Sequence, residues 1–595
     1  MKCHKCGNYL LVEAGENYAN FCATCGAKTR SKTLNYWLAK AAVFLFVFAV
    51  PVVIVSLITS LHDRIFVEER SFEGSYYTGG WFKGKPNGEG ILISYDEVRY
   101  EGSFVDGLFH GDGEMTWADG SYYVGKWENG FRTDGVMRIP GEFEFEGSFL
   151  EEEYWTGSII YDDGRWSEYI NGQHQVPKIA VKGMVIETDI EVLDLSGTQL
   201  GYTDIMQLEL LTDLRVLDLS DNHIINIAPL EPLTGLRELR LAGNGIFNVT
   251  PLQSMVNLEV LNLENNDISV ISSMQSLTAL TTLDLSGNSI RDITALSSLT
   301  KLKALQLSNN LIADISPLQS LTSLTTLDLT NCQVNDTEPM QYLTGLIELH
   351  AGQNQITDIS SLRPLTSMTE LLLHDNQISD IAPLEEMTEL TMLDLGHNQI
   401  SAIAPLQSLP NLKELRLMGN QITSVSALQQ LTELKRLCLQ DNRISNISSL
   451  QSLTGLTELN LSDNQISNVT PLQSMELLSS LRLSGNEISN INSLQSLINL
   501  VTLDLSGNSI RDISPLRLLT GLTALDLENN QVRDAAPLGE LTGLITLNLS
   551  GNQISDVALL ELLSNLTELS LHENRLDEAQ IDELRRALPQ CDISG

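Results

Sequence analysis

The chain of 595 residues is short of basic residues: 36 Lys and Arg stand against 76 Asp and Glu, giving a net charge of −40. The deficit begins after residue 62, because residues 1–62 hold six basic and only two acidic residues. Phosphate binding needs a basic surface, so no nucleic acid is expected as a main partner. An acidic exterior also keeps a large apolar repeat array soluble.

Cysteine is scarce outside the N-terminus. Of seven cysteines, only Cys332, Cys438 and Cys591 lie beyond residue 25, and they are far apart. Three isolated thiols do not make a disulfide framework. If this part of the chain faces the cell exterior, its stability there does not rely on disulfides.

Catalytic motifs are also missing. The sequence contains no GxSxG, HExxH, P-loop or dinucleotide fingerprint. Acidic pairs such as Asp218 and Asp221 fit a solvated surface. We therefore expect a protein that is not an enzyme. An LPxTG-like sorting signal is absent near the C-terminus, so any membrane anchoring would rest on the N-terminal part.

What the sequence does contain is an asparagine every 22 residues from Asn222 to Asn574, interrupted once by Cys332. Each lies in the phrase LxxLxxLxLxxN, as in residues 321–332 with Cys332 in the last place. A strict period of this length predicts a solenoid in which each repeat is one supersecondary unit. Solenoids present extended concave surfaces and usually bind other molecules.

The phrase itself predicts the geometry of each repeat. The LxL element puts two leucines on the inner face of a short strand, and strands of successive repeats stack in parallel. The asparagine turns inward to bond backbone groups that would otherwise be buried and unpaired. The remaining ten or so residues, often with a proline such as Pro405, are too few for an α-helix and predict extended or 3₁₀ structure.

This pattern, LxxLxxLxLxxNxIxDIxPLxxLT, resembles the bacterial internalin-like class of leucine-rich repeat. The resemblance implies a mainly β solenoid with short 3₁₀ turns over residues 191–576, about 18 repeats, and leaves the ligand open. Residues 577–595 predict a helical cap, because Ile581, Leu584 and Leu588 share one helical face. Residues 171–190 carry no repeat and are expected to be a linker and N-terminal cap.

Residues 71–170 are rich in glycine and aromatics at a period of 23, as in Tyr77-Thr-Gly79 and Tyr100-Glu-Gly102. Alternating aromatics between glycine-rich turns predict consecutive β-hairpins. The pattern resembles the MORN repeat family, whose units form a β-meander; the third unit departs from it at Asp134. The resemblance also implies lipid or protein binding. Because a membrane span is predicted just before these repeats, as described below, a stalk that holds the solenoid away from the membrane is the simpler role.

Residues 1–30 contain Cys3-x2-Cys6 and Cys22-x2-Cys25. Four thiolates at this spacing suit a closed tetrahedral zinc site, and so short a segment needs the ion to fold. It resembles a zinc ribbon with structural zinc. A redox pair and two disulfides are the alternatives.

Residues 36–62 predict a transmembrane helix, because residues 41–61 carry no charge and are long enough to cross a bilayer. A buried soluble helix is the alternative. Basic residues precede this span and acidic ones follow it, which predicts a cytoplasmic N-terminus and extracytoplasmic repeats.

The candidate partner surface lies where the concave positions become large and varied, between residues 348 and 441. Exposed apolar and basic side chains amid acids are typical of an interface core, and random variation of surface positions is the alternative. His350, His374 and His397 occupy successive repeats and could also form a metal site. Their diagonal arrangement on the strands keeps them too far apart to converge on one ion, which disfavours this alternative. The candidate residues are Glu348, His350, Glu370, Leu372, His374, Met392, His397, Glu414, Arg416, Met418, Arg436 and Cys438.

The sequence thus predicts a membrane-anchored binding protein whose solenoid recognises a protein or glycan, as adhesin, receptor or scaffold. A transmembrane sensor that signals through the zinc ribbon is the second hypothesis. A scaffold facing the cytoplasm is the third.

Overall fold

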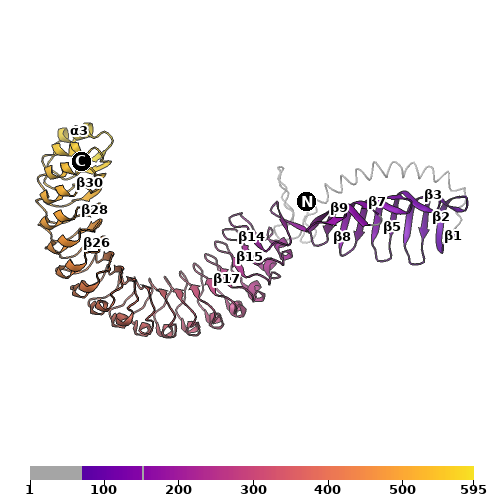
Figure 1. The fold of residues 1–595 in the computed structure, drawn as a ribbon, viewed down its shortest axis with the longest axis horizontal. Coiled ribbons are helices and arrows are strands. Elements are labelled where there is room, and N and C mark those ends of the chain that lie inside the picture. Colours follow the sequence, from indigo (N-terminus) through magenta and orange to yellow (C-terminus); the bar gives the residue numbers. More distant parts are fainter. Residues whose placement is uncertain (1–69, 151–152) are drawn as a thin grey trace, which may run out of the picture. The chain divides into compact units, whose positions relative to one another are not determined.

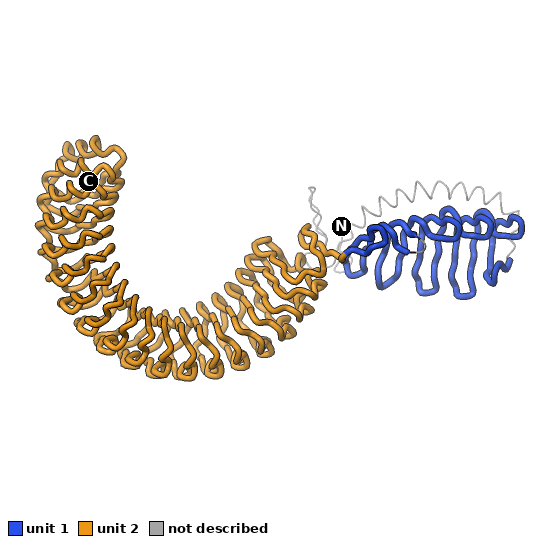
Figure 2. Tube along the Cα trace, in the orientation of Figure 1, with its two compact units in different colours: residues 1–175 blue, residues 176–595 orange. Residues whose placement is uncertain are grey.

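The computed structural model describes residues 70–150 and 153–595. The chain divides into two compact units, residues 1–175 and 176–595 (Figure 2). The predicted zinc ribbon, with Cys3, Cys6, Cys22 and Cys25, and the predicted membrane span at 36–62 both lie outside the described residues. Within those described ranges, no helix combines the length and the hydrophobicity needed to cross a bilayer.

The described part of unit 1 is an antiparallel meander in which each strand pairs with the next along the chain (Figure 1). This confirms the hairpins predicted from the glycine and aromatic pattern. The strands are β1 (Arg70–Phe72), β2 (Ser75–Phe82), β3 (Lys85–Ile93), β4 (Arg99–Val105), β5 (Leu108–Thr116), β6 (Tyr122–Glu128), β7 (Phe131–Ile139), β8 (Phe143–Leu150), β9 (Glu153–Tyr161), β10 (Trp166–Ile170) and β11 (Gln173–His174).

A continuous row of glycines crosses this meander, one from each of eight neighbouring strands. Each glycine is in register with the next: Gly79, Gly90, Gly102, Gly113, Gly125, Gly135, Gly147 and Gly157.

Buried aromatic rings cover this glycine row. A Cβ on Gly113 would lie 2.3 Å from the hydroxyl oxygen of Tyr100, so the ring occupies the space that a side chain would take. The Tyr77, Tyr100 and Tyr123 hydroxyls donate to main-chain carbonyls three residues ahead, at 3.0, 3.1 and 2.9 Å. The period of 23 therefore reflects a packing rule that repeats in each hairpin: one aromatic ring covers two facing glycines.

Unit 2 begins with the hairpin of β12 (Lys178–Val181) and β13 (Met184–Glu187), whose Ile179, Val181 and Ile186 join the solenoid core. A parallel sheet of nineteen strands follows. These are β14 (Val192–Asp194), β15 (Val216–Asp218), β16 (Glu238–Arg240), β17 (Val260–Asn262), β18 (Thr282–Asp284), β19 (Ala304–Gln306), β20 (Thr326–Asp328), β21 (Glu348–His350), β22 (Glu370–Leu372), β23 (Met392–Asp394), β24 (Glu414–Arg416), β25 (Arg436–Cys438), β26 (Glu458–Asn460), β27 (Ser480–Arg482), β28 (Thr502–Asp504), β29 (Ala524–Asp526), β30 (Thr546–Asn548), β31 (Glu568–Ser570) and β32 (Asp592–Ser594).

Each repeat returns through a 3₁₀ turn, from η2 (Met206–Leu210) to η18 (Ala558–Leu562), as the ten-residue return predicts. Figure 1 shows unit 2 as an arc with strands such as β26, β28 and β30 along its inner side. Inward leucines such as Leu393 and Leu395 are fully buried. The sheet therefore presents its free face to the inside of the arc.

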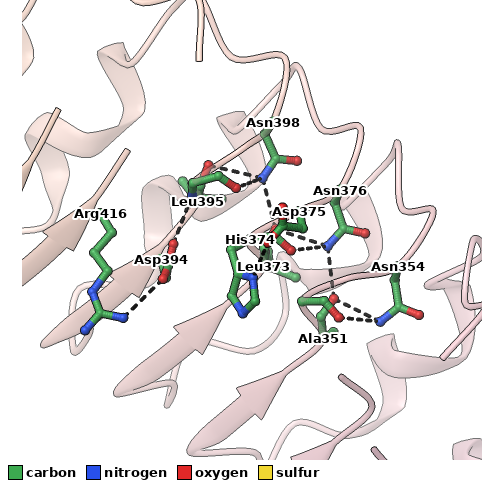
Figure 3. A network of polar contacts seen from close by, with 12 residues as sticks. Ala351, Asn354, Leu373, His374, Asp375, Asn376, Asp394, Leu395, Asn398 and Arg416 are labelled. Carbon is green, nitrogen blue, oxygen red and sulfur yellow. Dashed lines mark hydrogen bonds and ion pairs between the residues drawn. The ribbon is translucent and has the colours of Figure 1, made fainter. Parts of the chain in front are cut away.

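Most asparagines of the ladder, including Asn354, Asn376 and Asn398, are buried as predicted, and the others are half-buried (Figure 3). Asn398 donates to the carbonyls of Leu395 and Gly396 in its own repeat and to that of Leu373 in the preceding repeat, at 3.0–3.2 Å. Its side-chain oxygen accepts the main-chain N–H of Ile378 at 2.9 Å. Each ladder amide thus satisfies four backbone groups and ties two repeats together.

The solenoid ends with α3 (Glu578–Ala587) and β32. Asp577 and Gln580 form a capping box at the start of α3, and Ile581 and Leu584 are buried, as their spacing predicts. Strand β32 was not predicted from the sequence. It extends the sheet by one strand although it lacks the LxL phrase, because Ile593 takes the place of the inward leucine.

Cys332 fills the ladder position with weaker bonds. Its thiol lies 3.4 Å from the Leu307 carbonyl and 3.9 Å from that of Thr330. We expect Cys332→Asn to stabilise the protein by about 1 kcal/mol, because the amide group restores the ladder bonds to the neighbouring carbonyls and supplies an oxygen that accepts a main-chain N–H. Thermal unfolding measures this change in stability. Cys332→Ser is the control, because a serine hydroxyl is too short to make the full set of bonds that an asparagine amide makes at this position. Equal stability of the two variants would contradict the expectation.

Burial raises the pKa of the Cys332 thiol to about 11. Because the pKa is higher in the folded state than in the unfolded chain, where it is about 8.5, this group's contribution to stability is complete below about pH 8.5 and is lost as the pH rises through about 11. We expect the wild type to lose more stability than Cys332→Asn between pH 8 and 11. Denaturant titrations of both proteins at several pH values test this.

Candidate functional site

The candidate residues lie on or directly after five adjacent strands, β21–β25, and we call them together the central patch. Two columns run across these strands in register: Glu348, Glu370, Met392, Glu414 and Arg436 in the first, and His350, Leu372, Asp394, Arg416 and Cys438 in the second. His374, His397 and Met418 follow the strands in the turns that lead to the ladder asparagines. The parallel register is therefore what brings together residues that are 22 apart in sequence.

A chain of ion pairs crosses the patch. Arg416 lies 2.5 Å from Glu414 and 3.3 Å from Asp394. Arg436 continues the chain, 3.3 Å from Glu414 and 3.2 Å from Glu458 on β26. The charges of the patch are thus largely paired within the sheet face, which fixes the directions of these long side chains.

Asp394 belongs to the site although the sequence reasoning left it out. It is only 3 % exposed, and its second carboxylate oxygen accepts from Arg416 while the first accepts the Gly396 N–H at 2.9 Å (Figure 3). Aspartate recurs at this strand position in other repeats, for example Asp284 and Asp328, so its identity gave no signal. Only the neighbouring Arg416, which is in register, distinguishes it.

We expect Arg416→Met to lower the free energy of unfolding by about 2 kcal/mol, because it leaves the buried Asp394 carboxylate without its guanidinium. Adding Asp394→Asn should recover most of that loss. Urea unfolding, followed by hydrogen exchange in β23 and β24, measures both. The control is Arg237→Met, which removes an exposed ion pair to Glu259 and should cost less than about 0.5 kcal/mol. An equal loss from the control would contradict this role of Asp394.

Two glycines make room for two large patch residues. A Cβ on Gly352 would lie 2.5 Å from the His374 ring, and one on Gly396 would lie 2.6 Å from the Met418 sulfur. Both side chains therefore lie over the glycine of the preceding repeat. Repeats elsewhere have serine here, such as Ser286 and Ser506. The pairing of glycine in one repeat with a large residue in the next is a sequence signal that the reasoning missed.

Two of the three histidines of the patch lie against separate carboxylates. His350 lies 3.0 Å from Glu370, and His374 lies 2.8 Å from Asp375. His397 is exposed and adopts the left-handed conformation at φ 54°, which places its ring where a Cβ of Gly419 would lie. In the part of the chain that the structure describes, no cluster of three or more His, Cys, Asp or Glu residues could hold a metal ion.

Cys438 closes the second column next to Arg416. Burial raises the pKa of its thiol, and the nearby Arg416 guanidinium only partly opposes this effect. The thiol is therefore protonated at neutral pH, so this residue contributes polarizable contact surface to the patch.

Comparison with known proteins decides the family. The family described as leucine-rich repeats (2 copies) matches residues 256–298, 300–341, 344–386, 388–430, 432–474, 476–518, 498–540 and 520–561, which together are about half of the chain. The chain belongs to the leucine-rich repeat family. The MORN repeat family matches this leucine-rich repeat protein at residues 77–98 and 100–122, within the meander of unit 1.

Solved structures of bacterial and plant proteins are similar to this chain. A leucine-rich repeat protein of Leptospira interrogans is 25 % identical, with a TM-score of 0.52 over 69 % of this chain and 96 % of its own. An internalin of Listeria monocytogenes is 34 % identical, with a TM-score of 0.47 over 55 % of this chain and 90 % of its own. The Arabidopsis receptor kinase HAESA, solved with the peptide hormone IDA and a co-receptor, is 24 % identical, with a TM-score of 0.53 over 65 % and 75 %.

Among curated proteins, human alsin is 34 % identical over 92 residues, which are 14 % of this leucine-rich repeat protein. The match spans only 6 % of the length of alsin. Its rat and mouse counterparts match over the same length at 33 % identity. These matches therefore concern one segment and leave the whole-protein activity of alsin outside the comparison.

Proposed function

We propose that the solenoid binds a protein partner through the central patch. The observation that carries this proposal is the concave sheet face of β21–β25, where half-buried Leu372, Met392 and Met418 lie among ion-paired charges. Aliphatic and methionine side chains with arginine are typical of the core of a protein interface. A repeat surface without a binding role needs none of this variety.

Ion pairing within the patch favours binding energetically. The Arg416 and Arg436 side chains are already oriented by Asp394, Glu414 and Glu458, so less side-chain entropy is lost when a partner covers them. Glycine-backed His374 and Met418 lie flat in the same way. A pre-oriented, extended surface of this kind fits a folded protein or a bound peptide better than a small molecule.

Leucine-rich repeat proteins of this fold that were solved with a ligand suggest the class of partner. HAESA was solved with a peptide hormone, and its likeness to this chain extends to the fold only. We take a protein or peptide as the ligand and a glycan as the alternative. We further propose structural zinc on Cys3, Cys6, Cys22 and Cys25, a membrane span at 41–61, a cytoplasmic N-terminus and repeats on the extracytoplasmic side, where the protein acts as an adhesin, receptor or scaffold.

Capture experiments with the full chain test the patch. In-cell crosslinking and affinity capture should recover a partner with the wild type and lose it with the triple variant Leu372→Ala, Met392→Ala and Met418→Ala. The matched control is Val216→Ala with Val260→Ala, on the same face in other repeats. Recovery of the same proteins by all three forms would refute binding at the patch, provided that thermal unfolding shows each form to be folded.

A second candidate function is that of a sensor. The zinc ribbon predicted on the cytoplasmic side of the membrane, opposite the repeats, favours it. Deleting residues 1–30 should then abolish signalling while capture outside persists, whereas an adhesin or scaffold keeps its phenotype. Protease treatment of intact cells tests the topology: external repeats are digested and cytoplasmic ones survive.

A further inference from the structure

A second feature of the concave face lies beyond the central patch. Strands β27–β31 line a hollow of about 480 Å³. We call it the C-terminal hollow. Its walls are small and acidic side chains, with Thr502, Ala524 and Thr546 in one column and Asp504, Asp526 and Asn548 in the next. The short side chains are what opens the space, so positions that look monotonous in sequence form this hollow.

The carboxylates of the hollow lack cationic partners. Across the two described ranges, no salt bridge involves the lining residues Asp504, Asp526 and Glu568 or the nearby Glu528. Asn548 donates to both Asp526 and Glu528, at 3.3 and 3.0 Å, so one amide serves two anions. Arg482 lines one end of the hollow without forming an ion pair with its register neighbour Asp504. The central patch, in contrast, neutralises its acids internally.

Burial and the neighbouring charges agree with this picture. Burial raises the pKa of Asp526; hydrogen bonds from the Glu528 N–H and from Asn548 partly oppose this effect, and the Asp504 and Glu528 carboxylates add to it. A cation placed among these groups would relieve their mutual repulsion.

Two exposed aliphatic side chains lie just outside the lining of the hollow. Val501 and Ile545, which immediately precede β28 and β30, are 42 % and 45 % exposed. They lie beyond the column of Thr502 and Thr546, away from the acidic column, and we call them the aliphatic margin. A ligand that fills the hollow and extends past the threonine column would therefore meet carboxylates on one side and aliphatic side chains on the other. A free metal ion or a simple polyamine would leave that aliphatic margin uncovered.

We propose that the C-terminal hollow is a docking site for an extended segment of a partner protein in which basic and aliphatic side chains alternate. The five strands of the hollow span about 19 Å at the usual strand spacing, which an extended chain of about six residues covers. A lysine or arginine lies between Asp504 and Asp526, and aliphatic side chains contact Val501 and Ile545. The proposal goes beyond the central patch, because it assigns recognition to other repeats and to a defined ligand chemistry.

A peptide probe tests the proposal on the full chain. The probe is an acetylated, fluorescent hexapeptide of alternating valine and lysine, and fluorescence anisotropy measures its affinity at low and at high salt. We expect salt-sensitive binding that weakens about tenfold or more in Asp504→Asn with Asp526→Asn. A peptide with glutamate for lysine should not bind, and one with glycine for valine should bind more weakly.

The matched control is Asp284→Asn with Asp328→Asn, which changes the same strand position in repeats outside the hollow. It removes the same charge from the chain, so it should leave the affinity unchanged. Equal weakening in both double variants would show that the overall acidity of the chain attracts the peptide and would overturn the proposal. So would an absence of salt-sensitive binding.

The central-patch triple variant separates this proposal from the previous one. It should bind the hexapeptide like the wild type, whereas the Asp504→Asn with Asp526→Asn variant should still capture a partner of the central patch. Hydrogen exchange with the probe bound should show protection in β27–β31; protection confined to β21–β25 would overturn the assignment.

Discussion

Asn398→Ala is expected to lower the stability of the solenoid by about 3 kcal/mol. The substitution removes the side-chain amide that donates to three carbonyls and accepts the Ile378 N–H, which is left buried without its partner. The Leu373 and Leu395 carbonyls keep one bond each, from the neighbouring ladder asparagines. An unsatisfied buried N–H costs about 1–3 kcal/mol and each lost hydrogen bond about 0.5–1.5 kcal/mol, although relaxation and entering water offset part of the sum. Asn398 is only 8 % exposed, so water cannot simply replace the amide.

Hydrogen exchange is the better measurement of this loss, because a repeat array does not unfold as a single two-state unit. Amides near the substitution, including that of Ile378, should exchange faster, while distant repeats such as those at β15 and β16 should not. Asn257→Ala is the control, since Asn257 is exposed and makes one bond to the Thr234 carbonyl at 3.0 Å. Equal effects of the two substitutions would contradict the role assigned to the ladder.

Gly125→Ala should disrupt unit 1 to a similar extent. A Cβ at this position would lie 2.4 Å from the Tyr123 hydroxyl oxygen and 2.4 Å from the Asp134 carbonyl oxygen. Because the carbonyl belongs to the main chain, a side-chain movement cannot relieve the clash. We expect a loss of about 3 kcal/mol, at the upper end of what overpacking costs.

The effect should be local. Exchange should accelerate in β5–β8, whose strands are in register with Gly125 and Gly135, and the Tyr123 hydroxyl bonds to Lys126 and Asp134 should break. Glu114→Ala on the neighbouring strand is the control, because Glu114 is exposed. A folded Gly125→Ala variant with unchanged exchange in β5–β8 would refute the packing rule for the glycine row.

Much of the fold followed from the sequence because its rules are local and repeated. Leucine spacing, the ladder asparagine and the short return fixed the strands and 3₁₀ turns of every repeat, and the glycine and aromatic pattern fixed the hairpins. Strand β32 escaped prediction because Asp592-Ile-Ser594 carries no LxL phrase; it is a strand only because β31 offers it a free edge.

The site was less predictable, because its features arise between repeats. The sequence selected large side chains such as Leu372 and Arg416, and register places them together. It could not show that Gly396 makes room for Met418, or that Asp394 is buried by position. Nor could it show that small residues such as Ala524 open a hollow, since an empty space depends on what the neighbouring side chains leave uncovered.

Each ladder amide bonds only within its own repeat and to the preceding one, and this limits which insertions and deletions in the gene disturb the fold. Asn398 bonds to its own repeat and to the preceding one, and to nothing further along. Recombination that removes or inserts whole units in phase therefore rejoins the same set of bonds at the new junction. The array can therefore change length while every junction keeps its ladder bonds, and an event between β25 and β27 would change the distance between the two proposed recognition surfaces by one repeat.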